Sequence, residues 1–379
     1  MYSPMKRGVR PLYTILLLMA MAATLTYKIL FHQNCSFQLA YEAFSIKSPR
    51  RPVFNETLLK HAAVDPGEPL LKREIDDLLE GNFRTRGRQR SFLSSGNPRI
   101  DLRNSHRLGS PDFSERLLIL RKYLGDWSRN RKFSSNIMSE LADEVKSLID
   151  EQNGPYKSCA VVGNSGILLK SDYGAKIDGH EVVIRLNNAR TKGYEKNVGA
   201  KTNISFVNSN ILHLCSRRIN CFCHPYGDNV PIVMYICQPR HFFDYLACNS
   251  SHRAPLTVTD PRFDVLCARI VKYYSLKRFV EKTGKDVGEW APAHGGVYFH
   301  YSSGMQAVML ALGVCEKVSI FGFGKSESAR HHYHTFQKAE LSLHDYEAEY
   351  DFYRDLVERP WAIPFVSDKY EFPPVVMYH

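Results

Sequence analysis

Four histidines lie close together near the C-terminal end of the chain, shortly after a turn that contains two glycines. The histidines are His331, His332, His334 and His344, and the turn is 322–324. Histidine donates a proton to a departing phosphate when it is protonated, and it accepts a proton from a hydroxyl group when it is neutral. The cluster therefore predicts acid–base chemistry on a phosphate-bearing substrate, with metal ligation by the same histidines as the alternative.

Other motifs that would define a nucleotide, acyl-transfer or metal site are incomplete in this sequence. The turn 163–166 lacks the third glycine of a dinucleotide fingerprint, and 324–326 lacks the leading glycine of a P-loop because Ser319 occupies that position. The G-x-S-x-G frame of a nucleophile elbow does not occur. There is no D-x-D motif, and the C-x-C-H run at 221–224 lacks the spacing of a structural zinc site. We therefore predict no metal site and no cofactor.

Short apolar, β-branched runs alternate with longer amphipathic stretches from residue 158 onward. The apolar runs are 159–162, 182–186, 204–207, 230–237 and 318–321, and the helical stretches are 264–282, 303–312 and 344–358. This alternation predicts an α/β domain with a mostly parallel sheet that is covered by helices on both faces. Ligands of such folds bind beyond the carboxyl ends of the strands, which is where glycine, asparagine and serine residues cluster here.

The N-terminal part of the chain has a different composition. An apolar run at 11–31 follows three basic residues and is just long enough to span a bilayer. The basic flank places the N-terminus in the cytoplasm, although a cleaved signal peptide is an alternative interpretation. We therefore predict a cytoplasmic tail (1–10), a signal-anchor helix (11–31), a luminal stem of low order with a helical pattern at 70–80 (32–110) and a luminal catalytic domain (111–379).

A luminal setting determines how charge, cysteines and sequons are interpreted. About +8 of the net charge of +11 lies in the first 110 residues, and no basic helix interleaved with aromatic residues stands out beyond them, so we predict no nucleic-acid partner. Nine cysteines in an oxidising compartment predict paired disulfides, with Cys35 as the odd one that would allow a homodimer through the stem. Sequons predict glycosylation at Asn55, Asn203 and Asn249.

Four stretches of the α/β part carry recognisable motifs. The stretch 159–207 contains CAVVGNSG and RLNNA, and 300–324 contains HYSSG and FGFG. They are followed by HHYHT at 331–335 and by an H-x4-E pattern at 344–349. Together these stretches resemble the large, small, third and very small sialylmotifs of eukaryotic sialyltransferases, in the family's order, and the surrounding sequence looks most like the plant sialyltransferase-like branch. The resemblance implies a single Rossmann-like domain of the GT-A-variant sialyltransferase fold, anchored by one helix in the Golgi membrane.

The resemblance also implies an activity and a set of site residues. The reaction would be an inverting, metal-independent transfer of a 2-keto sugar acid, such as sialic acid or Kdo, from its CMP donor to the hydroxyl group of a glycan acceptor. A cationic His332 would hydrogen-bond to the departing phosphate, and His344 would be the general base. The donor would be held by Asn164, Ser165, Asn187, Ser302, Ser303, Gly304, Gly322, Gly324 and His331. Cys159 and Cys315 would form a disulfide that ties the two donor loops together.

Two departures from the family pattern keep other functions open. Tyr301 stands where the family usually has proline, and Thr335 stands where it has an acidic or amide residue. A catalytically inactive, CMP-binding scaffold protein of the Golgi is therefore a second hypothesis, and hydrolysis of a CMP-sugar is a third. The stretch 213–252 is expected to help shape the acceptor pocket. Glu349 would either orient His344 and its helix or have a purely structural role.

Overall fold

The computed structural model describes residues 54–64, 68–81, 111–141, 155–294, 299–324, 326, 329–335 and 343–379. Within these ranges, no helix combines the length and the apolar character that a bilayer-spanning segment needs. The predicted tail, the anchor at 11–31 and the larger part of the predicted stem lie outside the described residues, as does Cys35. The anchor and the stem dimer therefore stay predictions.

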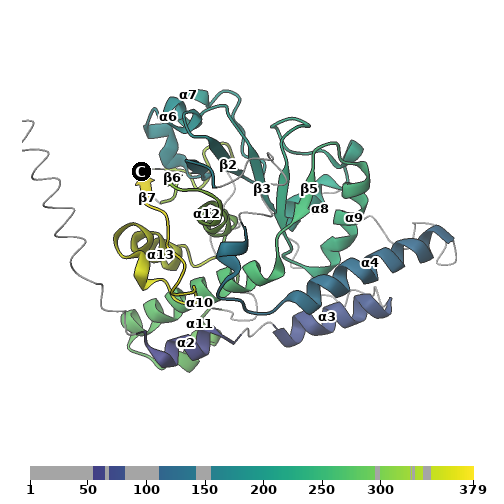
Figure 1. Cartoon of the computed structure of the whole chain (residues 1–379), viewed down its shortest axis with the longest axis horizontal. Coiled ribbons are helices and arrows are strands. Elements are labelled where there is room, and N and C mark those ends of the chain that lie inside the picture. Colours follow the sequence, from purple (N-terminus) through teal and green to yellow (C-terminus); the bar gives the residue numbers. More distant parts are fainter. Residues whose placement is uncertain are drawn as a thin grey trace, which may run out of the picture. The chain divides into compact units, whose positions relative to one another are not determined.

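Seven parallel strands form one sheet in the described part of the chain (Figure 1). The strands are β1 (Cys159–Val162), β2 (Val182–Leu186), β3 (Ile204–Asn208), β4 (Ile232–Tyr235), β5 (Leu256–Val258), β6 (Val318–Phe321) and β7 (Val375–Tyr378). Their order in the sheet is β5-β4-β3-β2-β1-β6-β7. The predicted α/β fold with a mostly parallel sheet is confirmed, and the two strands that were not predicted, β5 and β7, are the short edge strands.

Helices flank this sheet, and one of them lies at the centre of the core. The helices are α2 (Glu56–Ala62), α3 (Glu68–Glu80), α4 (Pro111–Asn130), α6 (Gly174–Asp178), α7 (Glu195–Val198), α8 (Ser209–Cys215), α9 (Phe242–Ser251), α10 (Pro261–Thr283), α11 (Trp290–Ala293), α12 (Ser303–Val314) and α13 (Tyr346–Glu358). Short 3₁₀ turns add η1 (Gly166–Lys170), η2 (Ile219–Cys221), η3 (Pro239–His241), η4 (Val287–Glu289) and η7 (Pro360–Ala362). Apart from Ser303 and Gln306, helix α12 consists of apolar residues and glycine, and it is buried along nearly its whole length, as expected for a helix inside a core.

Both faces of the sheet are covered, because side chains alternate between the faces along each strand. In β1, Cys159 and Val161 belong to the large core that contains α10 and α12. The neighbouring residues Ala160 and Val162 belong to a separate core on the other face, together with Ile177 of α6. A strand that is buried on both faces reads as a continuous apolar run, which is why β1 was visible in the sequence.

Two helices inside the predicted stem, α2 and α3, pack against this domain. Leu58 and Ala62 of α2 are buried in the core around α10. Ile75 and Leu78 of α3 are buried in a further core with α4 and α9. The expectation of low order for 32–110 therefore does not apply to these two helices, because each of them buries an apolar face.

Three disulfides lie in the described part of the chain. They are Cys159–Cys315, Cys215–Cys223 and Cys221–Cys248. The first is the pairing that the family resemblance implies. It joins the start of β1 to the end of α12, at the amino ends of the strands, so it does not tie the two donor loops directly to each other. Cys237 and Cys267 are free, so the expectation of fully paired luminal cysteines is wrong for these two. Cys267 is fully buried in the core around α10, where a thiol packs like a small apolar side chain.

The three predicted glycosylation sites differ in their surroundings. Asn55 and Asn249 are exposed, and the Asn55 side chain caps α2 by accepting a hydrogen bond from the backbone N–H of Leu58. Asn203 is half-buried, and its Oδ1 accepts a hydrogen bond from the backbone N–H of Val183 at 2.9 Å. Asn203 therefore helps to hold β2, whatever its modification, and glycosylation at the three sites stays a prediction.

Candidate active site

Two turns meet at the carboxyl ends of β1 and β6, and their backbones are in direct contact. A Cβ atom added at Gly163 would lie 2.7 Å from the carbonyl oxygen of Gly322, so no larger residue fits without a backbone shift. Gly322 has a φ of 74°, in the left-handed region that favours glycine. Ser165 Oγ donates a hydrogen bond to the carbonyl oxygen of Gly324 at 2.9 Å. Three of the predicted donor residues, Ser165, Gly322 and Gly324, are thus brought together.

The start of α12 lies at the same edge of the sheet, and the carboxyl group of Glu349 forms hydrogen bonds with it. Ser302 is the N-cap, and its Oγ accepts a hydrogen bond from the backbone N–H of Met305 at 3.1 Å. Glu349 accepts hydrogen bonds from the Ser302 backbone N–H at 2.7 Å and from its hydroxyl at 2.5 Å. At Gly304, an added Cβ would lie 2.7 Å from the ring of Phe323. The first N–H groups of a helix attract phosphate, so this helix start is suited to a phosphate oxygen.

A chain of polar side chains links the ends of β2 and β3 to α12. Asn187 follows β2 with a positive φ of 54°. Its Oδ1 accepts a hydrogen bond from Asn208 Nδ2 at 3.3 Å, and the same Nδ2 donates to Ser303 Oγ at 3.1 Å. The Ser303 hydroxyl also lies 3.4 Å from the hydroxyl of Tyr235. The predicted residues Asn187 and Ser303 are therefore joined through Asn208, which the sequence does not single out although it directly follows the predicted strand 204–207.

The histidine loop 330–335 lies on the turn that follows β1. The backbone N–H of Tyr333 donates to the carbonyl oxygen of Asn164 at 2.8 Å, and that of Gly166 donates to the carbonyl oxygen of Arg330 at 2.9 Å. Tyr333 is fully buried and anchors the loop. Asn164 Oδ1 is buried without a hydrogen-bond partner among the described residues. Buried polar atoms are normally paired, so this amide is placed to meet a polar group of a ligand.

His332 lies in a stack of histidine rings. Its ring centroid is 4.5 Å from that of His331 and 5.7 Å from that of His334, and its Nδ1 lies 3.3 Å from Thr335 Oγ1. Burial, together with the two neighbouring histidines, lowers the pKa of His332 to about 4. The lowered pKa favours the neutral ring near pH 7, whereas the cationic form expected from the sequence concerns a ring in contact with a phosphate. A neutral imidazole still donates one N–H.

His344 lies just before α13 and does not open the helix itself. Asp345 is the N-cap of α13, and His344 Nδ1 lies 3.0 Å from the carbonyl oxygen of His300. When Nδ1–H donates to that carbonyl group, Nε2 is left as a proton acceptor. The Tyr346 ring centroid lies 5.4 Å from that of His344 and 5.5 Å from that of His331. Tyr346 thus places the two histidine motifs next to each other.

Glu349 is the buried acid of this site. Its side chain is almost inaccessible to solvent, and burial raises its pKa to about 7. Besides its two hydrogen bonds with Ser302, it lies 3.4 Å from the hydroxyl of Tyr353. These contacts give Glu349 a positioning role at the start of α12. The H-x4-E spacing flagged this residue, but the sequence did not indicate the partner that it holds.

One further group has the geometry of a metal site in the part of the chain that the structure describes. It consists of His213 on α8, His241 at the end of η3 and Asp244 on α9. None of these residues belongs to the histidine loop or to the predicted donor set. No sequence motif points to this group, because its members come from separate elements without a characteristic spacing.

Comparisons with known proteins agree with the motifs. Residues 111–360 match the model of glycosyltransferase family 29 (sialyltransferase). The chain belongs to glycosyltransferase family 29. This family-29 chain is 53% identical to a beta-1,6-galactosyltransferase of Arabidopsis thaliana, over 99% of its own length and 100% of that relative. It is 48% identical to sialyltransferase-like protein 1 of Oryza sativa subsp. indica, over 99% of this chain and 100% of that one.

Solved structures of mammalian sialyltransferases match the chain more weakly. A crystal structure of a mammalian sialyltransferase matches it with 21% sequence identity and a TM-score of 0.38, covering 73% of this chain and 87% of that chain. The predicted membership of the sialyltransferase family is thus confirmed by the family model and by the relatives.

Proposed function

We propose that this family-29 chain is an inverting glycosyltransferase that adds galactose to a glycan hydroxyl through a β-1,6 linkage, from a nucleotide-activated donor. The observation that carries the proposal is the placement of His332 and His344 at one edge of the sheet, beside the glycine turns and the start of α12. The sugar and the linkage are those in the name of the Arabidopsis relative, which is 53% identical over its full length.

The donor phosphate is expected between the glycine turns and the start of α12. Backbone N–H groups of the helix start would bind its oxygens, and the N–H of His332 would donate to the oxygen that leaves with the nucleotide. Negative charge develops on this oxygen as its bond to the anomeric carbon breaks, so the contact with His332 strengthens in the transition state. A nearby phosphate raises the pKa of an imidazole, so a bound donor would oppose the lowering that burial causes at His332.

The acceptor step is assigned to His344. Its Nε2 would take the proton from the attacking hydroxyl group while Nδ1 stays on the carbonyl oxygen of His300. The hydroxyl oxygen forms its bond to the anomeric carbon on the side opposite the departing phosphate, so a single displacement inverts that centre. An α-linked nucleotide sugar then gives a β-linked product, which agrees with the β linkage named for the relative.

A second candidate donor is a CMP-activated 2-keto sugar acid such as sialic acid or Kdo. The four sialylmotifs and the description of the matched family favour it. The same residues would act, and the departing CMP carries a single phosphate group, which we propose needs no metal ion when His332 and the helix start receive it. A third candidate is a scaffold that binds the nucleotide and catalyses nothing.

A donor screen separates these candidates. The purified full-length chain is incubated with UDP-galactose, CMP-sialic acid or CMP-Kdo, with and without a galactan oligosaccharide, and nucleotide release is followed. UDP release that requires the acceptor supports galactosyl transfer, and acceptor-dependent CMP release supports the second candidate. Release without acceptor indicates hydrolysis, and no release from any donor supports the scaffold. The variant His344→Ala is the control for background release.

We further infer that the chain is a single-pass type II protein of the Golgi membrane with its catalytic domain in the lumen. The apolar run at 11–31, the basic residues before it and the disulfides of the α/β domain support this location. Protease digestion of sealed Golgi vesicles tests it, because a C-terminal tag should be protected until the membrane is opened with detergent. A tag that is digested in intact vesicles would contradict the inference.

A further inference from the structure

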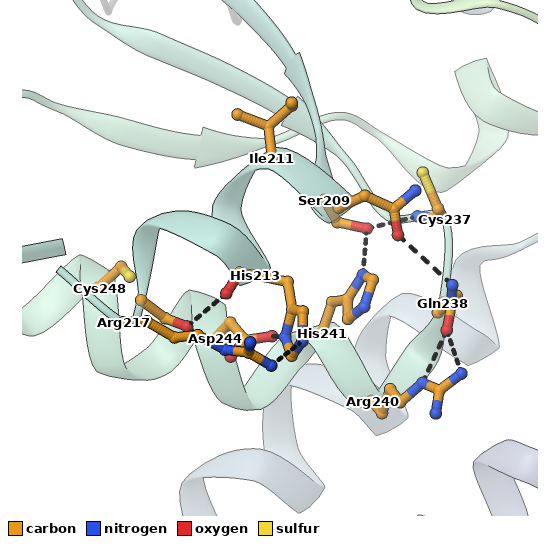
Figure 2. Close-up of polar contacts among 12 residues, drawn as sticks. Ser209, Ile211, His213, Arg217, Cys237, Gln238, Arg240, His241, Asp244 and Cys248 are labelled. Atoms are coloured by element: carbon orange, nitrogen blue, oxygen red, sulfur yellow. Dashed lines mark hydrogen bonds and ion pairs between the residues drawn. The ribbon is translucent and has the colours of Figure 1, made fainter. Parts of the chain in front are cut away.

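Two imidazoles and a carboxylate meet outside the histidine loop, where α8 faces η3 and α9. Figure 2 shows His213, His241 and Asp244 side by side. Each offers one ligand atom, and these atoms all lie within 4.8 Å of one another. His213 Nδ1 is 2.7 Å from Asp244 Oδ2, and the two imidazole centroids are 5.1 Å apart. A metal ion with ligand distances of about 2.0–2.2 Å needs only small side-chain shifts to reach all three.

Two serines form hydrogen bonds with His241 and Asp244 and so orient these side chains, as outer-shell partners do in metal sites. Ser209 Oγ lies 2.8 Å from His241 Nδ1, and it also accepts a hydrogen bond from the backbone N–H of Cys237 at 2.8 Å. With its ring proton on Nδ1, His241 presents Nε2 to the cluster. Ser216 Oγ donates to Asp244 Oδ1 at 3.0 Å, which leaves Oδ2 for a metal ion.

The three residues of the cluster differ in their exposure to solvent. His241 is 3% exposed. The side chains of His213 and Asp244 are 40% and 16% exposed. An ion bound here would therefore have protein on one side and solvent on the other, which leaves a fourth position for water.

We propose that His213, His241 and Asp244 bind a zinc ion whose fourth ligand is water. Two imidazole nitrogens and one carboxylate oxygen with an open position are a donor set that zinc commonly takes. The carboxylate also supplies a negative charge next to the ion. This site is independent of the proposed sugar transfer, because it uses none of the residues assigned to that reaction.

Arg217 forms a hydrogen bond with His213 that favours the metal-free state of the ring. Its Nη2 lies 3.1 Å from His213 Nε2, so in the metal-free protein Nε2 accepts this hydrogen bond and Nδ1–H donates to Asp244. Zinc bound at Nδ1 moves the ring proton to Nε2, which then faces another donor. Arg217 is exposed and can turn into solvent. Its removal should therefore strengthen zinc binding, whereas an ordinary polar cluster would only be weakened.

The ion would fasten α8 to α9 beside the candidate active site. Helix α8 begins directly after Asn208, which caps it and also holds Asn187 and Ser303. Two disulfides already staple the C-terminal end of α8 and η2 to their surroundings. Zinc would add a constraint that is close to the side chains at the end of β3.

Metal titration of variants tests the proposal. The full-length chain is freed of metal and titrated with Zn²⁺, and with Co²⁺, whose visible absorption reports a tetrahedral site. We expect one ion per chain, a loss of affinity greater than about 100-fold for His213→Gln and Asp244→Asn, and a loss of about 10–100-fold for Ser216→Ala. Arg217→Ala should bind more tightly than the unmodified chain, and the matched control His252→Gln should bind equally well.

A variant in the histidine loop distinguishes zinc binding at the cluster from zinc binding elsewhere. The loop 331–334 could also take up an ion, so His334→Gln is titrated in parallel. Binding that survives His213→Gln and Asp244→Asn but is lost in His334→Gln would overturn the proposal, and so would an unmodified chain that binds no ion. Both residues varied in the cluster are partly exposed, and circular dichroism with thermal unfolding checks that the variants are folded.

Discussion

The two halves of the sheet's carboxyl edge are built by different means. The glycine half comprises the turns 163–166 and 322–324 and the start of α12, and its parts touch through backbone atoms. The cysteine half comprises 209–251, where two short-range disulfides and a polar cluster fix the helices. In the glycine half the lack of side chains lets the backbones touch, and in the cysteine half covalent bonds between side chains hold the helices. Each arrangement fixes the relative positions of the elements. The glycine half should be sensitive to one added methyl group, and the cysteine half to the loss of a bond.

The largest expected effect lies at His344, beside the glycine half. His344→Ala removes the proposed base and leaves the phosphate-binding elements in place, so kcat should fall by about 10²–10⁴-fold while nucleotide affinity stays nearly unchanged. Steady-state kinetics and calorimetric titration of the nucleotide measure the two quantities. His61→Ala on α2, an unrelated helix, is the control. A variant of His344 that transfers normally, or that loses nucleotide binding as severely as turnover, would assign the base elsewhere.

Two disulfides compare the cysteine half with the opposite edge of the sheet, because Cys159–Cys315 lies at the start of β1. Cys159–Cys315 closes a loop of 156 residues and Cys215–Cys223 a loop of 8. In the chain-entropy model the long loop contributes about 5 kcal/mol to the free energy of unfolding and the short loop about 2.5 kcal/mol. Cys159→Ser should therefore destabilise the protein more than Cys223→Ser, as measured by denaturant unfolding. Equal losses would show that native contacts, not loop length, dominate the effect.

A single methyl group tests the backbone contact of the glycine half. Gly163→Ala forces the added Cβ against the Gly322 carbonyl oxygen, so the free energy of unfolding should fall by about 1–3 kcal/mol. At Gly179, which ends α6, the nearest atom to an added Cβ is 3.4 Å away. Gly179→Ala should leave stability unchanged or raise it by up to about 1 kcal/mol. If both variants behave alike, the two turns do not touch as described.

The smallest expected effect is a pH dependence from Glu349. Its pKa is raised from 4.5 to about 7 in the folded protein, so the folded state holds a proton that the unfolded state has lost. The stability from the neutral carboxyl group is fully present below about pH 4.5 and is lost as the pH rises through about 7. Glu349→Gln should show a shallower pH dependence of unfolding over this window. An unchanged pH profile would contradict the raised pKa.

The strands and the glycine half could be predicted from the sequence for a physical reason. A strand buried on both faces is a continuous apolar run, and glycines at strand ends mark close backbone approach, so β1 and Gly322 were both visible. The edge strand β5 has only three residues, and its signal is too short to stand out. His344 was expected to open a helix, but Asp345 caps it, and boundaries depend on local hydrogen bonds that the pattern does not show.

The contents of the cysteine half could not be predicted in the same way. The stretch 213–252 was expected only to help shape an acceptor pocket. His213 meets Asp244 because α8 packs beside α9, and no fixed spacing encodes such a contact between two helices. The free thiols follow the same rule, because the number of cysteines does not show which of them the fold brings together, and Cys267 on α10 forms no disulfide. The lowered pKa of His332 likewise depends on burial.

The configuration of the product tests the central claim most directly. That claim is that His344 activates an acceptor hydroxyl for one displacement of a nucleotide at the glycine half. Proton NMR of the product formed from UDP-α-galactose and a galactan acceptor should show a new anomeric signal with the large coupling of a β-galactoside linked to O6. An α-linked product would contradict single displacement and with it the role proposed for His344.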